Sequence, residues 1–197
     1  MAWYRNVNYN IDPRVYDPSD DSFMLIDCLD VCRGDRVLEV GCGCGLVSIH
    51  CAREGGHVTC SDINRHALKL AKSNARMNNM ELRAIRADIF RGNRSRFDIV
   101  IFNPPYLPVG PEERVAGEWI EMAVSGGSDG ADLIRRFIPQ LKDHLTKKGR
   151  GYMIVSSSNP VDELMELASN SGLKVEVAGK LGLFMEVVYC WRLTCTR

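Results

Sequence analysis

The chain has 197 residues, of which 45% are hydrophobic and 25% are charged, and its 25 Lys and Arg residues balance its 25 Asp and Glu residues. This length and apolar content suit a globular domain and exclude a disordered or fibrous protein, while zero net charge argues against a general electrostatic affinity for DNA or RNA. Since there is neither an apolar run of the roughly 18 to 20 residues that cross a bilayer nor a secretory signal pattern, we expect one soluble, cytoplasmic domain over residues 1–197.

The predicted elements alternate along the chain. Residues 1–19, rich in Asn, Asp and Pro, are predicted to form an irregular arm, and Asp20 or Asp21 can cap the helix that follows. Runs of β-branched and apolar residues then predict strands at 36–40, 57–62, 81–86, 97–102, 152–155, 175–178 and 184–192. Apolar residues at helical spacing predict further helices at 45–53, 65–78, 131–145 and 160–170.

This alternation predicts a doubly wound α/β fold, in which helices cover both faces of a mainly parallel, seven-stranded sheet. A short turn at Leu181–Gly182 joins the last two strands, which we expect to form an antiparallel hairpin at the edge of the sheet. Sheets of this kind bind ligands at the carboxyl ends of their strands, where the strand order reverses. Functional residues are therefore expected directly after the strands.

The eight cysteines do not form a metal-binding pattern, because no Cys-x-x-Cys pair recurs as it does in a zinc ribbon. The four histidines also have no metal-binding spacing. We expect reduced thiols, as in a cytosolic protein, and no metal site in this chain.

Three glycines at alternate positions, Gly41, Gly43 and Gly45, follow the first predicted strand and its acidic residue Glu39. Because they have no Cβ, these glycines let the backbone turn sharply and approach a ligand closely. A nicotinamide-binding loop would require glycine at the position of Leu46, and no Gly-Lys-Ser/Thr run follows as it does in a phosphate-binding loop. The loop therefore matches neither of these two motifs.

Acidic residues also end the next two strands, at Asp62 and Asp88. With the glycine loop they resemble the motifs of class I S-adenosylmethionine-dependent methyltransferases, whose fold is Rossmann-like. The resemblance implies that Glu39 meets the methionine ammonium, Asp62 binds the ribose hydroxyls, and Asp88 binds the adenine amino group beside the backbone amide of Ile89. Taken singly, Asp62 could instead cap the following helix, and an Asp in a loop is common.

The tetrapeptide Asn103-Pro104-Pro105-Tyr106 at the end of the fourth strand is the most specific pattern in the chain. One interpretation is a turn stiffened by proline. The pattern also resembles the catalytic motif of methyltransferases that act on planar nitrogens, in adenine, cytosine or the glutamine side chain. The Asn103 oxygen and the Pro104 carbonyl would each accept one N–H bond from that nitrogen. Proline rigidity would hold the backbone acceptor still, and Tyr106 would pack against the flat substrate.

Residues 15–27 resemble the N-terminal signature of the archaeal and eukaryotic glutamine methyltransferases that modify class I translation release factors, which are relatives of the bacterial HemK family. Asp17 and Asp20 stand where that signature has Glu, and Ser22 stands where its Ser or Thr touches the methionine carboxylate of the cofactor. The run Gly126-Gly127-Ser128-Asp129-Gly130 resembles a later segment of the same family. The short chain also suits this branch, because bacterial relatives carry an additional N-terminal domain.

The resemblance implies methyl transfer from S-adenosylmethionine to the glutamine of the release factor's Gly-Gly-Gln loop, with S-adenosylhomocysteine as the product. It further implies a heterodimer with a small zinc-binding activator protein, whose docking face could include Leu82, Ile85 and Ile89. The implied catalytic residues are Asn103, Pro104, Pro105 and Tyr106. The implied cofactor-binding residues are Ser22, Glu39, Gly41, Gly43, Asp62, Ile63, Asp88, Ile89 and Asn103.

Charge gives weaker support for a protein substrate. Residues 112–132 hold six acids and one Arg, a charge of −5 that would repel a duplex and attract a basic peptide, although a solvated surface explains it equally well. Residues 65–96 hold nine Lys and Arg against two acids, a charge of +7 that could dock RNA or an acidic partner, or could simply be solvated. Two other functions stay open: an adenine methyltransferase acting on nucleic acid, and an inactive cofactor-binding scaffold subunit.

Overall fold

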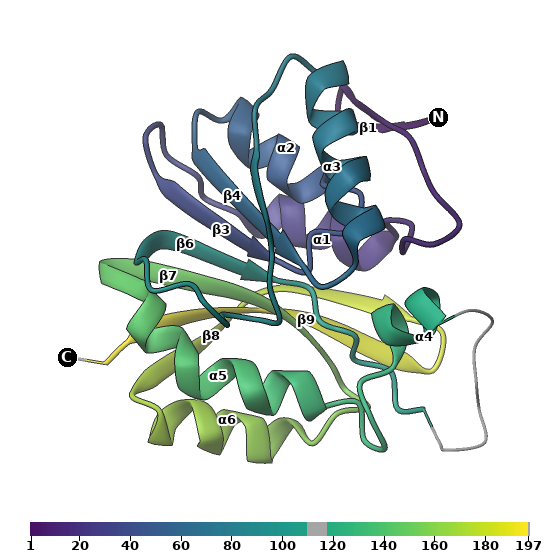
Figure 1. The fold of residues 1–197 in the computed structure, drawn as a ribbon. Helices are drawn as coiled ribbons and strands as arrows, with labels where there is room; N and C mark the ends of the chain where they lie inside the picture. The colour runs from purple at the N-terminus through teal and green to yellow at the C-terminus, as the bar shows by residue number, and fades with distance from the viewer. Residues whose placement is uncertain (110–117, 197) are drawn as a thin grey trace.

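The computed structural model describes residues 1–109 and 118–196, and its main feature is a seven-stranded sheet (Figure 1). Five strands run parallel in the spatial order β5-β4-β3-β6-β7, and β9 and β8 complete the sheet as an antiparallel hairpin. This arrangement confirms the predicted doubly wound, mainly parallel sheet with an antiparallel edge. The strands are β3 (Arg36–Val40), β4 (His57–Asp62), β5 (Arg83–Arg86), β6 (Phe97–Phe102), β7 (Leu145–Ser156), β8 (Leu173–Leu183) and β9 (Glu186–Cys195).

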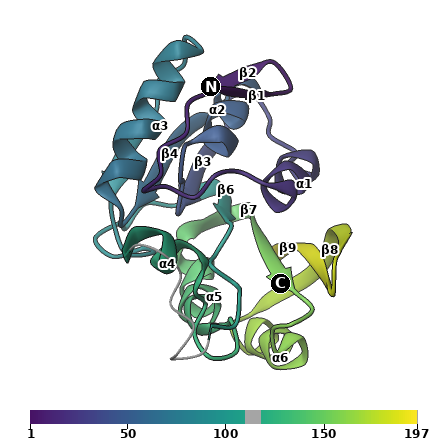
Figure 2. The same cartoon turned by 90° about the vertical axis from the view of Figure 1, so that its right-hand side faces the viewer.

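Helices cover both faces of the sheet, as Figure 2 shows, because the central strands carry apolar residues on both sides. On β6, Ile99 and Ile101 pack with one group of helices, and Val100 and Phe102 pack with the other. The first group is α1 (Asp20–Cys28), α2 (Leu46–Arg53) and α3 (Arg65–Met77). The second group is α5 (Asp132–His144) and α6 (Val161–Asn170), and the short α4 (Glu118–Val124) lies beyond the carboxyl ends of the strands.

The N-terminal segment differs from the prediction of an irregular arm over residues 1–19. It contains a two-stranded antiparallel sheet, β1 (Ala2–Tyr4) and β2 (Val7–Tyr9). Arg5 and Asn6 join these strands with positive φ angles of 43° and 64°, which suit a tight hairpin turn. Val7 and Tyr9 are buried against the helices, so packing rather than strand length stabilises this hairpin.

The last hairpin turns at Phe184–Met185 and not at Leu181–Gly182. Leu181 and Gly182 pair with β9, so β8 continues through the predicted turn. The predicted strand start at Phe184 is therefore wrong, because Leu183 pairs with Glu186 and leaves a two-residue connection.

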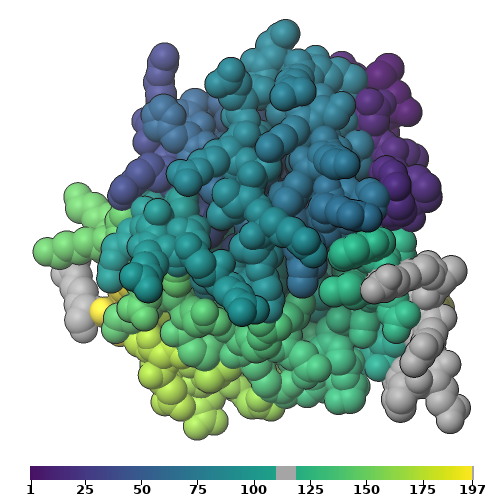
Figure 3. Space-filling model, viewed as in Figure 1, coloured from purple at the N-terminus to yellow at the C-terminus, as the bar shows by residue number. Residues whose placement is uncertain are grey.

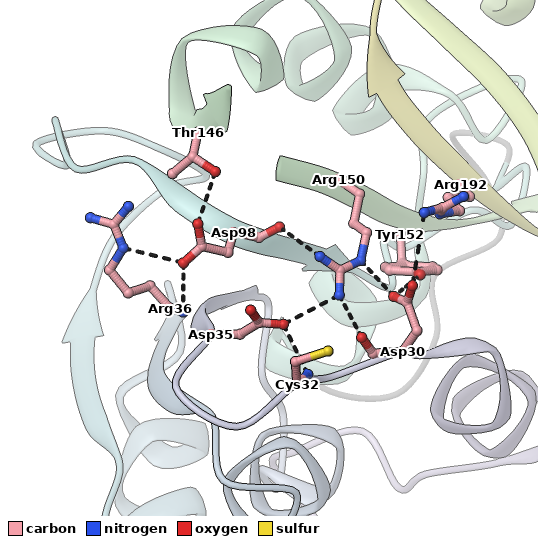
Figure 4. Close-up of polar contacts among 9 residues, drawn as sticks. All are labelled: Asp30, Cys32, Asp35, Arg36, Asp98, Thr146, Arg150, Tyr152 and Arg192. Carbon is pink, nitrogen blue, oxygen red and sulfur yellow. Dashed lines mark hydrogen bonds and ion pairs between the residues drawn. The ribbon is translucent and has the colours of Figure 1, made fainter. Parts of the chain in front are cut away.

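A polar network ties the loop between α1 and β3 to β7 (Figure 4). Arg150 donates to Asp30 and, over 3.2 Å, to Asp35, and the hydroxyl of Tyr152 also donates to Asp30. The side chain of Arg150 is only 13% exposed. The network therefore anchors the far end of α1, the helix that carries Ser22, against the sheet.

Candidate active site

A cleft lies at the carboxyl ends of β3, β4 and β6 and encloses about 1040 Å³, including its open mouth. It forms where the strand order reverses between β4-β3 and β6, as the sequence predicted for a ligand site. All nine predicted cofactor-binding residues line this cleft: Ser22, Glu39, Gly41, Gly43, Asp62, Ile63, Asp88, Ile89 and Asn103. Residues from well-separated parts of the chain are thus brought to one cavity by the parallel sheet.

The glycine loop between β3 and α2 requires glycine for two separate reasons. Gly41, Gly43 and Gly45 have φ angles of 68°, 52° and 82°, in the left-handed region that other residues rarely adopt. A Cβ on Gly45 would also lie 2.7 Å from the Cβ of Ala71, so this glycine lets α3 pack directly on the loop. The neighbouring Cys42 and Cys44 are buried side chains of the core.

Glu39, the residue before the last one of β3, is buried and only 4% exposed. The hydroxyl of Ser48 on α2 donates a hydrogen bond to it. Burial raises the pKa of Glu39 to about 8, against the lowering effect of the bond from Ser48. Burial favours the neutral form of this carboxyl group, and a cation that enters the cleft beside it would favour the carboxylate.

Asp62 ends β4 and holds the glycine loop in place. Its Oδ2 accepts from the backbone N–H of Gly43 over 3.0 Å, and its Oδ1 accepts from that of Asn64 over 2.8 Å. Burial raises the pKa of Asp62 against these backbone bonds. Asn64, which accepts from the backbone N–H of His66, is the capping residue of α3, so Asp62 does not cap that helix.

Asp88 follows β5 and forms an ion pair with α5, a helix of the second group. The guanidinium of Arg136 on α5 donates to Asp88 Oδ2 over 2.6 Å, a contact that spans 48 residues of sequence. The next residue, Ile89, has a φ of 51° and is buried, so it lines the cleft in a left-handed conformation. Because Ile89 lies inside the cleft, its expected place on an outer docking face is wrong.

A second, smaller cavity adjoins the first at the predicted catalytic tetrapeptide. Its lining includes Asn103, Pro104, Pro105 and Tyr106, and the first cleft is lined by Asn103 and Pro105 as well. Asn103 is therefore shared by both cavities. Its Oδ1 atom is buried and has no hydrogen-bond partner among the described residues.

Asp21 is a site residue that the sequence did not reveal, because its position at the start of a helix predicts a cap. The helix actually begins at Asp20, after Ser19, and the carboxylate of Asp21 points to the tetrapeptide. Its Oδ2 accepts from Asn103 Nδ2 and from the Tyr106 hydroxyl, each over 3.1 Å. The available signal was its place beside Ser22 in residues 15–27, the segment that resembles the family signature, although this pattern does not reveal a contact 82 residues away.

The glycine-rich run at 126–130 supports the backbone of the tetrapeptide. Gly126 N–H donates to the carbonyl of Leu107, and a Cβ on Gly130 would lie 2.1 Å from the carbonyl oxygen of Tyr106. Within the acidic segment, Asp129 is paired with Arg135 over 2.6 Å. Glu112 and Glu113 of that segment lie outside the described residues, so the proposed acidic surface is only partly described.

Two negative findings concern residues 1–109 and 118–196. No group of three or more His, Cys, Asp or Glu side chains in these ranges could hold a metal ion, and their eight cysteines are unpaired. None of the helices in this part of the chain has the length and apolar character needed to cross a membrane.

A family model described as the methyltransferase small domain matches residues 17–180 of this chain. The chain belongs to this family. The methyltransferase is 36% identical over 191 residues to a putative protein N5-glutamine methyltransferase of Methanocaldococcus jannaschii, and the match covers 95% of this chain and 96% of that protein. It is 31% identical over 188 residues to the eRF1 methyltransferase catalytic subunit mtq2 of Schizosaccharomyces pombe, covering 82% of this chain and 80% of that one.

A solved structure of the E. cuniculi Mtq2-Trm112 complex resembles the methyltransferase with a TM-score of 0.73 at 24% sequence identity. The match covers 93% of this chain and 99% of that chain, and it shows that the fold is shared. Together with the relatives, it confirms the predicted HemK-related family and the predicted Rossmann-like fold.

Proposed function

We propose that the chain transfers a methyl group from S-adenosylmethionine to the side-chain amide nitrogen of the glutamine in the Gly-Gly-Gln loop of a class I release factor. We infer that this reaction takes place in the cytoplasm, where release factors act. The observation that carries the proposal is the buried Oδ1 of Asn103, which has no donor among the described residues and belongs to a residue that lines both cavities. A buried acceptor without a partner is rare in proteins and points to a donor supplied by a ligand.

The residues of the larger cleft fit S-adenosylmethionine. Glu39 offers a buried carboxylate to the methionine ammonium, and Asp62 offers a second carboxylate, at the tip of β4, to the ribose hydroxyls. Ser22 lines the same cleft and would bind the methionine carboxylate. The bound cofactor would supply a methyl group that the adjacent sulfonium has already activated.

The remaining cleft residues would surround the rest of the cofactor. Gly41 and Gly43 let the backbone approach the ligand without a Cβ in between. Ile63, which is 40% exposed, would pack on the adenine ring, while Asp88 and the backbone of Ile89 would bind its polar edge. The expected product, S-adenosylhomocysteine, would occupy the same contacts.

The smaller cavity would hold the substrate amide. An amide nitrogen is a weak nucleophile and carries two protons, so its position decides whether it reacts. Asn103 Oδ1 and the Pro104 carbonyl would accept one N–H each and would stabilise the positive charge that develops as the nitrogen bonds to the methyl carbon. The bond between the methyl carbon and the sulfonium sulfur would break as the new bond forms, and the nitrogen would then give one of its protons to water, which restores its neutrality. Correct placement of two reactants can contribute roughly 7 to 11 kcal/mol to such a reaction.

The test uses the purified chain with a candidate activator, methyl-labelled S-adenosylmethionine and an intact release factor. We expect label in the release factor, none in a loop variant with Gln→Ala, and at least about 100-fold slower labelling by Asn103→Ala. Labelled DNA with unlabelled release factor would contradict the proposal and select an adenine methyltransferase. If cells that carry Asn103→Ala modify the release factor as fully as before, the chain is instead an inactive scaffold subunit.

We further propose that the free edge of β5 pairs with a small zinc-binding activator protein. In the described part of the sheet β5 has only one neighbour, β4, and its four residues include the half-buried Ile85. An unpaired edge strand can accept another strand through its backbone. The nine Lys and Arg residues of 65–96 are all exposed, and this segment covers much of the face shown in Figure 3, which would favour an acidic partner.

Co-expression tests the partner proposal. We expect the chain alone to be poorly soluble and to become soluble with the activator. Ile85→Pro, which would disturb strand pairing at this edge, should reduce recovery of the complex. A stable and fully active monomer would contradict an obligate partner.

A further inference from the structure

The carboxylate of Asp21 is buried beneath the catalytic tetrapeptide, with only 2% of the residue exposed. Its two oxygens receive different donors. Oδ1 accepts from the backbone N–H of Ser22 over 2.6 Å and from the hydroxyls of Ser19 and Ser22. Oδ2 accepts from Asn103 Nδ2 and from the Tyr106 hydroxyl. One oxygen thus contacts both ends of the tetrapeptide.

This contact, together with a longer one of 3.4 Å from Asn103 Nδ2 to the Ser22 hydroxyl, determines how the Asn103 amide is oriented. The oxygen and nitrogen of a carboxamide have nearly the same shape, so packing alone does not distinguish the two orientations. A carboxylate only accepts hydrogen bonds, and it therefore draws the NH₂ group of Asn103 toward itself. The opposite end, Oδ1, is left buried and without a partner among the described residues.

We propose that Asp21 is a positioning residue for methyl transfer, which fixes Asn103 with its oxygen toward the substrate amide. The inference rests on the proposed function. Asp21 also lines the smaller cavity, and in this role it acts through Asn103. Its negative charge, transmitted along the chain of hydrogen bonds, also makes Asn103 Oδ1 a stronger acceptor as positive charge develops on the substrate nitrogen.

The test reverses the polarity of the pair. In Asp21→Asn, the new side chain keeps its oxygen on the Ser22 N–H and turns its NH₂ group toward Asn103, so Asn103 must present its own NH₂ group to the substrate. We expect kcat for release-factor methylation to fall by about 100-fold, with the cofactor Kd changed by less than about threefold. Adding Asn103→Asp restores a donor–acceptor pair and leaves one oxygen free, so the double variant should recover at least about tenfold in kcat.

Asp20→Asn is the matched control, because Asp20 lies next in sequence but is exposed. It should keep the kcat of the unaltered chain. A double variant that is no faster than Asp21→Asn, or an Asp21→Asn variant with normal kcat, would overturn the proposal. If Asp21→Asn does not fold, the double variant is compared with Asn103→Asp alone. In Asn103→Asp two carboxylates face each other, so this single variant should be slower than the double variant.

The unaltered chain separates the two levels of the proposal. If it methylates the release factor and the double variant shows no recovery, only the positioning role of Asp21 fails. If the unaltered chain with its activator transfers no methyl group to the release factor, the proposed function fails.

Discussion

Ser48, in the first turn of α2, donates its hydroxyl to the buried carboxylate of Glu39 at the end of β3. This single side-chain donor does not compensate for burial, and the pKa of Glu39 is raised from 4.5 to about 8. In the free protein Glu39 therefore holds a proton over most of the neutral range. The approach of a cationic group would favour the loss of that proton.

The first prediction is that S-adenosylmethionine affinity rises with pH between about 6 and 8. Below about pH 8, binding of the ammonium must release the Glu39 proton, so the Kd should fall by up to about tenfold per pH unit. Isothermal titration calorimetry in two buffers of different ionisation enthalpy measures the released proton directly. Glu39→Gln should bind more weakly and without this pH dependence, and a constant Kd for the unaltered chain would contradict the role of Glu39.

The second prediction concerns the stability of the free protein. Because the folded-state pKa of Glu39 is raised, protonated Glu39 contributes to the stability of the fold. This contribution is fully present below about pH 4.5 and is lost as the pH rises through about 8. Glu39→Gln has no such proton to lose. The Tm of this variant, relative to the unaltered chain, should therefore be higher at pH 8.5 than at pH 5, as differential scanning calorimetry can measure. A constant difference in Tm would show that Glu39 titrates normally.

The third prediction separates backbone strain from steric contact by comparing Gly45 of the glycine loop with Gly92, which lies outside that loop. Gly45 and Gly92 have φ angles of 82° and 80°, but a Cβ on Gly45 would meet Ala71 and a Cβ on Gly92 would meet nothing within 4 Å. Gly92→Ala should cost about 1–2 kcal/mol for the left-handed conformation, and Gly45→Ala should cost clearly more. Urea unfolding gives both values. Equal losses would mean that α3 can move away from the loop.

The fourth prediction isolates the hydroxyl of Tyr106. Tyr106→Phe keeps the flat ring but removes one donor to Asp21, a hydrogen bond worth about 0.5–1.5 kcal/mol. We expect kcat to fall by about two- to tenfold, the equivalent of that energy, while the cofactor Kd stays the same. Tyr106→Leu, which also removes the flat surface, should be slower still. The outcome that contradicts this order is a Phe variant as slow as the Leu variant.

The fifth prediction concerns the network in Figure 4. Arg150→Met removes the donor shared by Asp30 and Asp35 and should lower the free energy of unfolding by about 2 kcal/mol. The loss of a fully buried ion pair would cost more, but Asp30 is 56% exposed. Lys174→Met breaks the exposed pair with Glu176 and should change stability by less than about 1 kcal/mol. Chemical denaturation compares the two, and equal losses would show that burial of Arg150 adds nothing.

The sheet and the cofactor cleft could be predicted because both depend on local patterns. An apolar run marks β6, glycine at alternate positions marks the loop after β3, and an acid such as Asp62 stands at the end of its strand. The parallel order of the sheet then brings these strand ends together without further information.

The parts that were missed depend on contacts between distant segments. Asp21 and Arg136 reach their partners across 82 and 48 residues, and the local pattern around each of them does not reveal these contacts. The hairpin at residues 2–9 was missed for a related reason, because strands of three residues carry too short a pattern and are stabilised by burial of Val7 and Tyr9.

Asn103 forms part of the wall of both cavities, which therefore lie on either side of one residue. A single molecule with a nucleoside at one end and a carboxamide at the other would span this wall and occupy both compartments. Such a bisubstrate compound would lose its translational freedom once rather than twice, which is the thermodynamic basis of tight inhibition by linked fragments.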